Sequence, residues 1–149
     1  METIALASDH RGFAYKEELT AFIRNLGFMP LDLGTKSTDR VDSQDYGVAA
    51  ALALKEGRAS KAIIICGSGN GIAIAANRFR HVRAALCPHA TAAKMARQHN
   101  DANIISLAAD FMGYDLIKDC VEVFLKTEFL GGRYAERVEK LNKLDPNKF

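Results

Sequence analysis

The sequence predicts a single α/β domain in which a five-stranded parallel sheet has helices on both faces. Short apolar runs alternate with longer segments whose apolar residues recur at helical spacing, an alternation that is typical of such sheets. The 149 residues suit one domain with a continuous core, and no internal repeat, low-complexity tract or linker divides them. We therefore expect one three-layer, Rossmann-like domain over residues 1–149.

The first part of the chain is expected to supply two strands and two helices. Residues 3–7 form a buried strand, and residues 13–26 have apolar side chains at helical spacing up to Gly27, a common helix stop. Residues 28–33 form a second strand, and Pro30 favours an edge position because proline cannot donate a ladder hydrogen bond. A polar loop over residues 34–44 then leads into an alanine-rich helix from about Asp45 to Glu56.

The rest of the chain continues the alternation. A β-branched apolar run from Lys61 ends at Cys66 as the third strand, and an Ala/Ile-rich helix follows from near Asn70. The later strands are expected at residues 82–87 and 102–107, and the later helices at 89–98, 113–127 and 133–144. The helix breakers Asp145-Pro146-Asn147 follow the last helix.

The segment Cys66-Gly67-Ser68-Gly69-Asn70-Gly71 joins the third strand to its helix. Its three alternating glycines bring backbone N–H groups and the positive end of a helix dipole toward whatever binds there. A thiol at a helix N-terminus also ionises more readily than a free one. The segment therefore predicts an anion site with a potential nucleophile or base beside it. The alternative is a tight strand-to-helix turn around a buried structural cysteine.

The spacing of this segment excludes two common phosphate-binding loops. A Walker loop requires G-x-x-x-x-G-K-[ST], and no lysine or hydroxyl follows the glycines at that spacing. The dinucleotide pattern G-x-G-x-x-G fails because Ile72 occupies the third glycine position, and the first acidic residue after the loop is Asp101.

Other polar residues lie near the ends of predicted elements. Asp9 and His10 follow the first strand, where a carboxylate beside an imidazole suits ring opening and proton transfer, although Asp9 could simply cap the next helix. His99 lies in a polar cluster at the end of a helix, where it could also favour the negative end of the dipole. Arg133 and Arg137, four residues apart, share a helix face suited to a phosphate, unless they are plain surface arginines.

The composition limits the partners and the compartment of the protein. A net charge of +2 is too weak to indicate nucleic acid or an anionic membrane as the main partner. No apolar run is long enough to span a bilayer, and the start Met1-Glu2-Thr3 lacks the basic residues of a signal peptide. Three widely spaced cysteines favour a reducing compartment without a disulfide framework, so we expect a cytoplasmic protein.

Several motifs together resemble a known family. They are Asp9-His10-x-Gly12, Asp32-x-Gly34, the glycine segment from Cys66 to Gly71 with Ala75-Ala76-Asn77, Arg97-Gln98-His99-Asn100-Asp101-x-Asn103, and Gly131-Gly132-Arg133 with Arg137. In order and spacing, along essentially the whole chain, they resemble the ribose-5-phosphate isomerases of the B type. Those enzymes belong to a sugar-phosphate isomerase family that also holds the galactose-6-phosphate isomerase subunits.

The resemblance implies an aldose–ketose isomerase of the pentose phosphate pathway. Such an enzyme interconverts D-ribose 5-phosphate and D-ribulose 5-phosphate through a cis-enediolate, with no metal and no organic cofactor. The implied catalytic residues are Cys66 as the base, Ser68 as a proton relay, His99 as the acid in ring opening and Asp9 as a contact to the sugar. The implied binding residues are the backbone of Gly67, Gly69, Asn70 and Gly71 at the oxyanion, Asn100 at a hydroxyl, and His10, Arg133 and Arg137 at the phosphate.

The resemblance also implies how the chains assemble. A homodimer, or a dimer of such dimers, is expected, with His99 serving the active site of the partner subunit. The helix of about residues 133–144 is expected near the active site. The implied partner is a small sugar phosphate.

The chain departs from the family pattern in three places. Ser43 and Gln44 occupy the places of a common Tyr-Pro pair whose tyrosine lines the site. Asp110 occupies the place of an arginine that commonly contributes to phosphate binding, so we expect this carboxylate to repel phosphate. Ser68 replaces a common threonine, which is a mild change. Where some relatives have a glutamate base after the third glycine, this chain has Ile72, so Cys66 has no rival as the base.

Two other functions stay open. An isomerase of a related phosphosugar, such as a six-carbon aldose 6-phosphate, would use the room that Ser43 leaves. A non-catalytic module that binds a sugar phosphate or a nucleotide would need the glycine loop alone. The presence of Cys66, Asp9 and His99 argues against such a module, because pure binding requires none of them.

Overall fold

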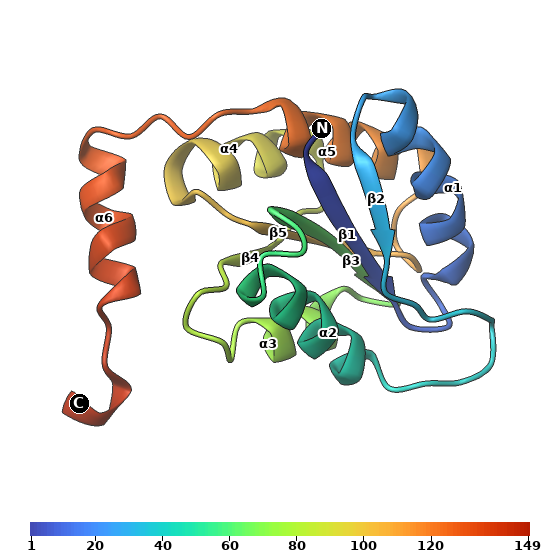
Figure 1. Ribbon diagram of the computed structural model, residues 1–149, viewed down its shortest axis with the longest axis horizontal. Coiled ribbons are helices and arrows are strands. Elements are labelled where there is room, and N and C mark those ends of the chain that lie inside the picture. Colours follow the sequence, from blue (N-terminus) through green and yellow to red (C-terminus); the bar gives the residue numbers. More distant parts are fainter.

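A computed structural model describes residues 1–149 and contains a five-stranded, all-parallel sheet in the order β2-β1-β3-β5-β4 (Figure 1). The strands are β1 (Thr3–Ser8), β2 (Met29–Asp32), β3 (Lys61–Cys66), β4 (Ala84–Leu86) and β5 (Ile104–Ala108). The helices are α1 (Phe13–Asn25), α2 (Ser43–Lys55), α3 (Asn70–Ala76), α4 (Ala90–Asn100), α5 (Tyr114–Lys126) and α6 (Arg133–Asn142), before a 3-10 turn over Pro146–Lys148. The predicted α/β class and its five parallel strands are confirmed.

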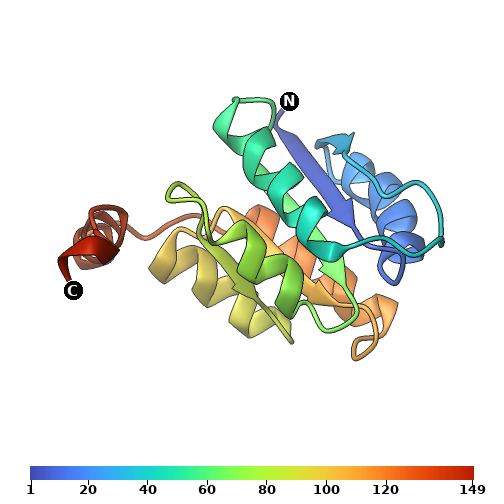
Figure 2. The same cartoon turned by 90° about the horizontal axis from the view of Figure 1, so that it is seen from below.

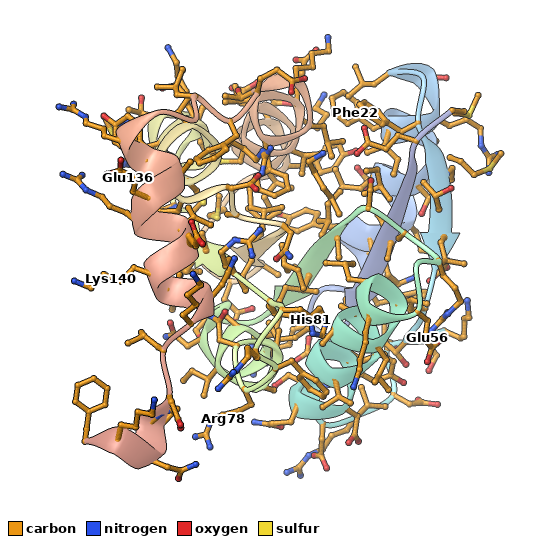
Figure 3. The ribbon with its side chains drawn as sticks, turned by 60° about the vertical axis from the view of Figure 1, so that its left-hand side comes forward. Phe22, Glu56, Arg78, His81, Glu136 and Lys140 are labelled. Carbon is orange, nitrogen blue, oxygen red and sulfur yellow. The ribbon has the colours of Figure 1, made fainter.

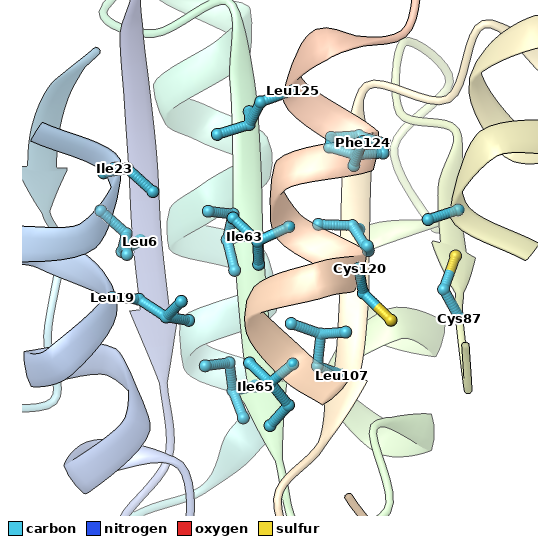
Figure 4. Packing of buried hydrophobic residues seen from close by; sticks show 14 of the residues in the cluster. Leu6, Leu19, Ile23, Ile63, Ile65, Cys87, Leu107, Cys120, Phe124 and Leu125 are labelled. Atoms are coloured by element: carbon cyan, nitrogen blue, oxygen red, sulfur yellow. The ribbon is translucent and has the colours of Figure 1, made fainter. Parts of the chain in front are cut away.

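Helices cover both faces of the sheet and enclose two hydrophobic clusters (Figures 1 and 2). The side chains of β3 alternate between them, because successive residues of a strand point to opposite faces. Ile63 and Ile65 pack with α1, α4 and α5, and Figure 4 shows this cluster around Phe124. Ile64 and Cys66 pack with α2 and α3 on the other face. Each fully buried isoleucine contributes about 1.5–3 kcal/mol, so the sheet is a stable support for the loops at its ends.

The order of the strands determines where a ligand would bind. From β1 the chain moves to β2 on one side, and the later strands are added on the other side, starting with β3. The switch point therefore lies between the carboxyl ends of β1 and β3, which is where open α/β sheets usually bind ligands. Asp9 follows β1 and Cys66 ends β3, so the fold brings both to this point.

The predicted elements differ from the observed ones mainly at their ends. The edge position of the strand that contains Pro30 is confirmed, since β2 pairs only with β1. The strand predicted at residues 82–87 is shorter because the side chain of Asn103 binds the N–H of Arg83 at 2.8 Å, before the ladder begins. Helix α4 begins one residue late because His89 is its cap, with Nδ1 accepting the N–H of Ala92 at 3.1 Å. It also extends to Asn100, past the predicted end at Gln98.

Helix α6 stands apart from the layers that enclose the sheet. A connection over residues 127–132 carries the chain from α5 to α6, which packs against α4 alone among the helices and strands with substantial contacts (Figures 1 and 2). Val138 is the one buried residue of this helix, whereas Glu136 and Lys140 are exposed (Figure 3). None of the helices combines the length and the apolar character that crossing a bilayer requires.

Candidate active site

The glycine loop brings its backbone close to the thiol of Cys66. Gly69 has a φ of +76°, and a Cβ there would lie 2.6 Å from Cδ1 of Leu86, so only glycine fits. This turn lets the N–H of Gly69 donate to Sγ of Cys66 at 3.2 Å. A backbone N–H in this position can stabilise negative charge on the sulfur. The side chain of Ser68 is turned toward the helix start, where its Oγ accepts the N–H of Asn70 at 3.2 Å.

Asp9 lies beside Cys66 at the ends of adjacent strands. Ser8 is opposite Ile65 in the register, and the N–H of Asp9 donates to the carbonyl of Ile65 at 3.1 Å. The carboxylate is 6% exposed, and its Oδ1 accepts the N–H groups of Arg11 at 2.9 Å and Gly12 at 3.2 Å. Both N–H groups precede α1, whose N-cap is Gly12 without a side-chain cap, so Asp9 stabilises the turn before the helix and does not cap it. Oδ2 makes no hydrogen bond within the protein, so Asp9 can hold this turn through Oδ1 and still contact a ligand.

His10 presents one ring nitrogen to the same region. Its Nδ1 accepts the N–H of Val41 at 3.3 Å, so in the neutral ring the proton is on Nε2. That N–H can donate to an anion. The hydrogen bond also ties the loop before α2 to the end of β1, which keeps the imidazole oriented.

The first two residues of α2 reach the third glycine of the loop. A Cβ on Gly71 would lie 3.1 Å from Oγ of Ser43 and 3.2 Å from Nε2 of Gln44. Ser43, one of the positions that depart from the family pattern, therefore lies at the glycine loop. Two small polar groups line this side of the loop.

Asp110, the residue expected to repel phosphate, has a positively charged partner in the structure. Its Oδ2 accepts a hydrogen bond from Nη1 of Arg11 at 2.6 Å, so the carboxylate is part of an ion pair. Sequence reasoning missed Arg11, which occupies the variable place of the Asp9-His10-x-Gly12 motif. The only signal was the coincidence of an unexpected acid with an unassigned arginine.

A second polar cluster forms where α4 ends against α6. The ring of His99 stacks on the ring of Tyr134 with a centroid distance of 4.3 Å and an angle of 8°. The guanidinium groups of Arg133 and Arg137 lie 5.1 Å and 5.8 Å from the centre of the same ring. Both arginines therefore do share a face, as their spacing predicts, and Asn100 is the exposed last residue of α4. Tyr134 was missed, although its position between the two arginines was a usable signal.

Within one chain the two clusters lie at opposite ends of the parallel strands. His99 and Asn100 precede the start of β5 at Ile104, whereas Cys66 pairs in the register with Ala108 at the other end of that strand. Four steps along β5, at about 3.3 Å each, correspond to about 13 Å, before the side chains are counted. The fold thus brings Asp9, His10 and Cys66 together and separates them from His99, Arg133 and Arg137. Figure 1 shows α6 standing at the side of the molecule, against α4.

Two further cysteines and one arginine are buried and have structural roles. Burial raises the pKa of Cys87 to about 12 and that of Cys120 to about 11, so both thiols stay protonated near neutral pH. Arg97 is buried and bridges Asp101 at 2.8 Å and the carbonyl of Ala102 at 2.6 Å, which fixes the end of α4. No three His, Cys, Asp or Glu side chains gather closely enough to hold a metal ion.

Comparison with known proteins gives a consistent result. A family model described as Ribose/Galactose Isomerase matches residues 4–141. Ribose-5-phosphate isomerase B of Escherichia coli is 38% identical over 145 residues, which cover 97% of this chain and 97% of that protein. A structure of ribose-5-phosphate isomerase B from Clostridium thermocellum has a TM-score of 0.94 at 41% identity and covers 99% of both chains. The Thermotoga maritima ribose 5-phosphate isomerase has a TM-score of 0.92 at 39% identity, over 96% of this chain and 99% of that chain.

Proposed function

The chain belongs to the ribose/galactose isomerase family, and we propose that it interconverts D-ribose 5-phosphate and D-ribulose 5-phosphate. The observation that carries this assignment is the full-length match to ribose-5-phosphate isomerases B, and a thiol at the carboxyl end of β3 supports it. Cys66 ends a buried strand and accepts a hydrogen bond from the N–H of Gly69 at 3.2 Å, and Asp9 follows the adjacent strand β1. A binding module would need none of these groups.

In the proposed reaction the cyclic sugar first opens. His99 donates a proton to the ring oxygen as the bond from that oxygen to C1 breaks, and the C1 hydroxyl releases its proton to solvent to form the carbonyl. Asp9 holds a sugar hydroxyl through Oδ2, the oxygen that makes no hydrogen bond within the protein. The carbonyl at C1 of the open aldose then makes the C2 proton acidic. Cys66, as the thiolate, takes this proton, and the C2–H electron pair forms the enediolate double bond.

The charge that develops on the enediolate oxygens then needs donors. Backbone N–H groups of the loop from Gly67 to Gly71 are proposed to supply them, because a fixed glycine turn offers them without rearrangement. Ser68 is proposed to pass a proton between O1 and O2, and Cys66 returns its proton to C1 to give the ketose. The phosphate is proposed to bind His10 together with Arg133 and Arg137, and Asn100 a hydroxyl.

We further propose that each active site is built from two chains. The separation of Cys66 from His99 along β5 supports this, since the acid and the base of one reaction must be within reach of one sugar. A two-fold dimer in which α4 and α6 of one chain meet the glycine loop of the other would make two identical sites. The α6 arm, standing clear of its own sheet, is suited to that role (Figure 1). Two such dimers could associate further without changing the sites.

The three free cysteines agree with a reducing environment, and we propose the cytoplasm as the location. The proposed partner is the sugar phosphate itself, with neither nucleic acid nor membrane.

A coupled assay on the purified protein tests the activity. Ribose 5-phosphate should be converted to ribulose 5-phosphate with EDTA present, and Cys66→Ala should lose the activity. A six-carbon aldose 6-phosphate in the same assay examines the alternative substrate, for which the small Ser43 at Gly71 leaves room. A higher kcat/KM for the six-carbon sugar would overturn the assignment of ribose 5-phosphate, and no turnover of either sugar would overturn the isomerase.

A further inference from the structure

Arg11 is held at the candidate site by its own backbone. Its main-chain N–H donates to Oδ1 of Asp9 at 2.9 Å, in the turn that starts α1. His10, the preceding residue, is fixed by its hydrogen bond from Val41. The side chain of Arg11 therefore starts beside two residues of the proposed mechanism.

The side chain of Arg11 crosses the first glycine of the loop. A Cβ added to Gly67 would lie 2.9 Å from Cδ of Arg11 and 2.8 Å from Oδ2 of Asp110. Gly67 follows Cys66 directly, so the ion pair lies over the residue next to the thiol. A glycine at this position is required for the pair to approach so closely.

Asp110 is also held in place by the backbone. Its N–H donates to the carbonyl of Gly67 at 3.0 Å, and the N–H of Ala109 donates to the carbonyl of Cys66 at 2.9 Å. The carboxylate, tied to the loop in this way, accepts the 2.6 Å hydrogen bond from Nη1 of Arg11. It therefore restrains a long flexible side chain that would otherwise have many rotamers.

Most of the hydrogen-bonding capacity of Arg11 is unused. A guanidinium has five N–H donors, and one of them binds Asp110. The side chain is 59% exposed and its other N–H groups make no hydrogen bond within the protein, so they are available to a ligand. Ion pairs this exposed stabilise a fold by about 0–1 kcal/mol, so stability alone is a weak reason for this one.

Resting on the proposed function, we propose that Arg11 binds the phosphate of the sugar phosphate and that Asp110 positions its guanidinium. A planar guanidinium suits a phosphate because two parallel N–H groups can bind two of its oxygens. The Nε2–H of His10 lies one residue away on the same turn and adds a further donor. The carboxylate that by itself would repel a phosphate thus orients the cation that attracts it.

The rival explanation is a purely structural pair that links the loops after β1 and β5. Variants that move the positive charge distinguish the two. Arg11→Ala removes the cation and leaves Asp110 unpaired, Arg11→Ala/Asp110→Ala removes both charges, and Arg11→Ala/Asp110→Arg puts a cation on the other loop without restoring any ion pair. Arg58→Ala is the matched control, because Arg58 pairs with Glu56 at 2.7 Å with similar exposure, away from the glycine loop.

The readouts are KM and kcat for ribose 5-phosphate, and the dissociation constant of inorganic phosphate measured by calorimetry. Arg11→Ala should raise KM and the phosphate dissociation constant about tenfold, with a smaller change in kcat, while Arg58→Ala changes neither. Arg11→Ala/Asp110→Ala should bind phosphate more tightly than Arg11→Ala, and Arg11→Ala/Asp110→Arg should recover most of the loss. A structural pair predicts no such recovery.

Phosphate affinity and KM within twofold of wild type in Arg11→Ala overturn the proposal. The proposal also fails if Arg11→Ala/Asp110→Arg has the melting temperature of wild type but does not recover the phosphate affinity that Arg11→Ala loses. If Arg11→Ala/Asp110→Arg has a lowered melting temperature, the comparison of Arg11→Ala with Arg11→Ala/Asp110→Ala decides instead. Equal phosphate affinities in those two variants contradict the electrostatic role of the pair. Should the wild type bind phosphate through Arg11 and yet turn over no ribose 5-phosphate, the proposed function fails and the anion site remains.

Discussion

Mixing two inactive variants tests whether each active site uses two chains. Cys66→Ala removes the base at the carboxyl end of β3, and His99→Ala removes the acid before the opposite end of β5. In a heterodimer of these two chains with composite sites, one site carries both lesions. The other site combines the intact Cys66 of one chain with the intact His99 of its partner, so it should work.

The expected recovery follows from the symmetry. Chains refolded together in equal amounts pair at random, so half of the dimers are heterodimers, and about one quarter of all sites are intact. Each variant alone should keep about 1% of wild-type turnover or less, the usual low end for loss of a positioned acid or base. The mixture should therefore reach about 25% of wild-type activity, roughly 25-fold above either parent.

The assay is isomerisation of ribose 5-phosphate by differently tagged chains. Heterodimers purified on both tags should have about half the wild-type activity, because one of their two sites is intact. Mixing the folded variants without subunit exchange is the control and should recover nothing. Doubly purified heterodimers that are no more active than their parents would show that the site lies within one chain.

Other perturbations address single groups. Cys66→Ala should lower kcat at least about a hundredfold while ribose 5-phosphate still binds, and turnover within a few-fold of wild type would contradict its role as base. Arg137→Ala should weaken substrate binding by about 1.5–3 kcal/mol, seen as a higher KM, whereas unchanged affinity for substrate and for inorganic phosphate would make it a plain surface arginine. Dialysis against EDTA should leave activity unchanged, because no three metal-ligating side chains gather, and activity restored only by zinc would refute this. Burial would raise the pKa of Asp32, but hydrogen bonds from Lys16 and the Gly34 N–H outweigh this effect and lower the pKa. The ionised carboxylate therefore stabilises the fold above about pH 4, and this contribution is lost as the pH falls further. Asp32→Asn should lower the free energy of unfolding, measured in urea at pH 7, by about 1–3 kcal/mol, because buried Lys16 loses its partner at 2.9 Å. The difference from wild type should shrink below pH 4, and equal stability of the two proteins at pH 7 would contradict this role.

Local patterns in the sequence were enough to predict the sheet and its helices. The short apolar runs and the apolar residues at helical spacing identify the elements because these side chains are buried, and Pro30 identified an edge strand by its missing N–H. The element ends were less accurate where side chains bind backbone groups. His89 capping α4 and Asn103 binding Arg83 are examples, since neither changes the apolar period.

Contacts between distant residues could not be predicted in the same way. Arg11 and Asp110 are 99 positions apart, and a single sequence shows neither that they meet nor that Gly67 leaves room for them. Asp110 alone indicated a repulsive charge, whereas the structure pairs that charge with Arg11. Likewise, the stacking of His99 on Tyr134 depends on α6 folding back against α4.

The projecting position of α6 links substrate binding to subunit association. If a sugar phosphate is held by the Cys66 loop of one chain and the arginines on the α6 arm of the other, it binds the assembled pair and not the separate chains. A ligand at a hundred times its dissociation constant then strengthens association by about 2.7 kcal/mol for each site it fills. By reciprocity, dilution that separates the chains also weakens their hold on the sugar. The substrate of such an enzyme therefore also stabilises its dimer, and the fraction of assembled, active enzyme rises with the substrate concentration.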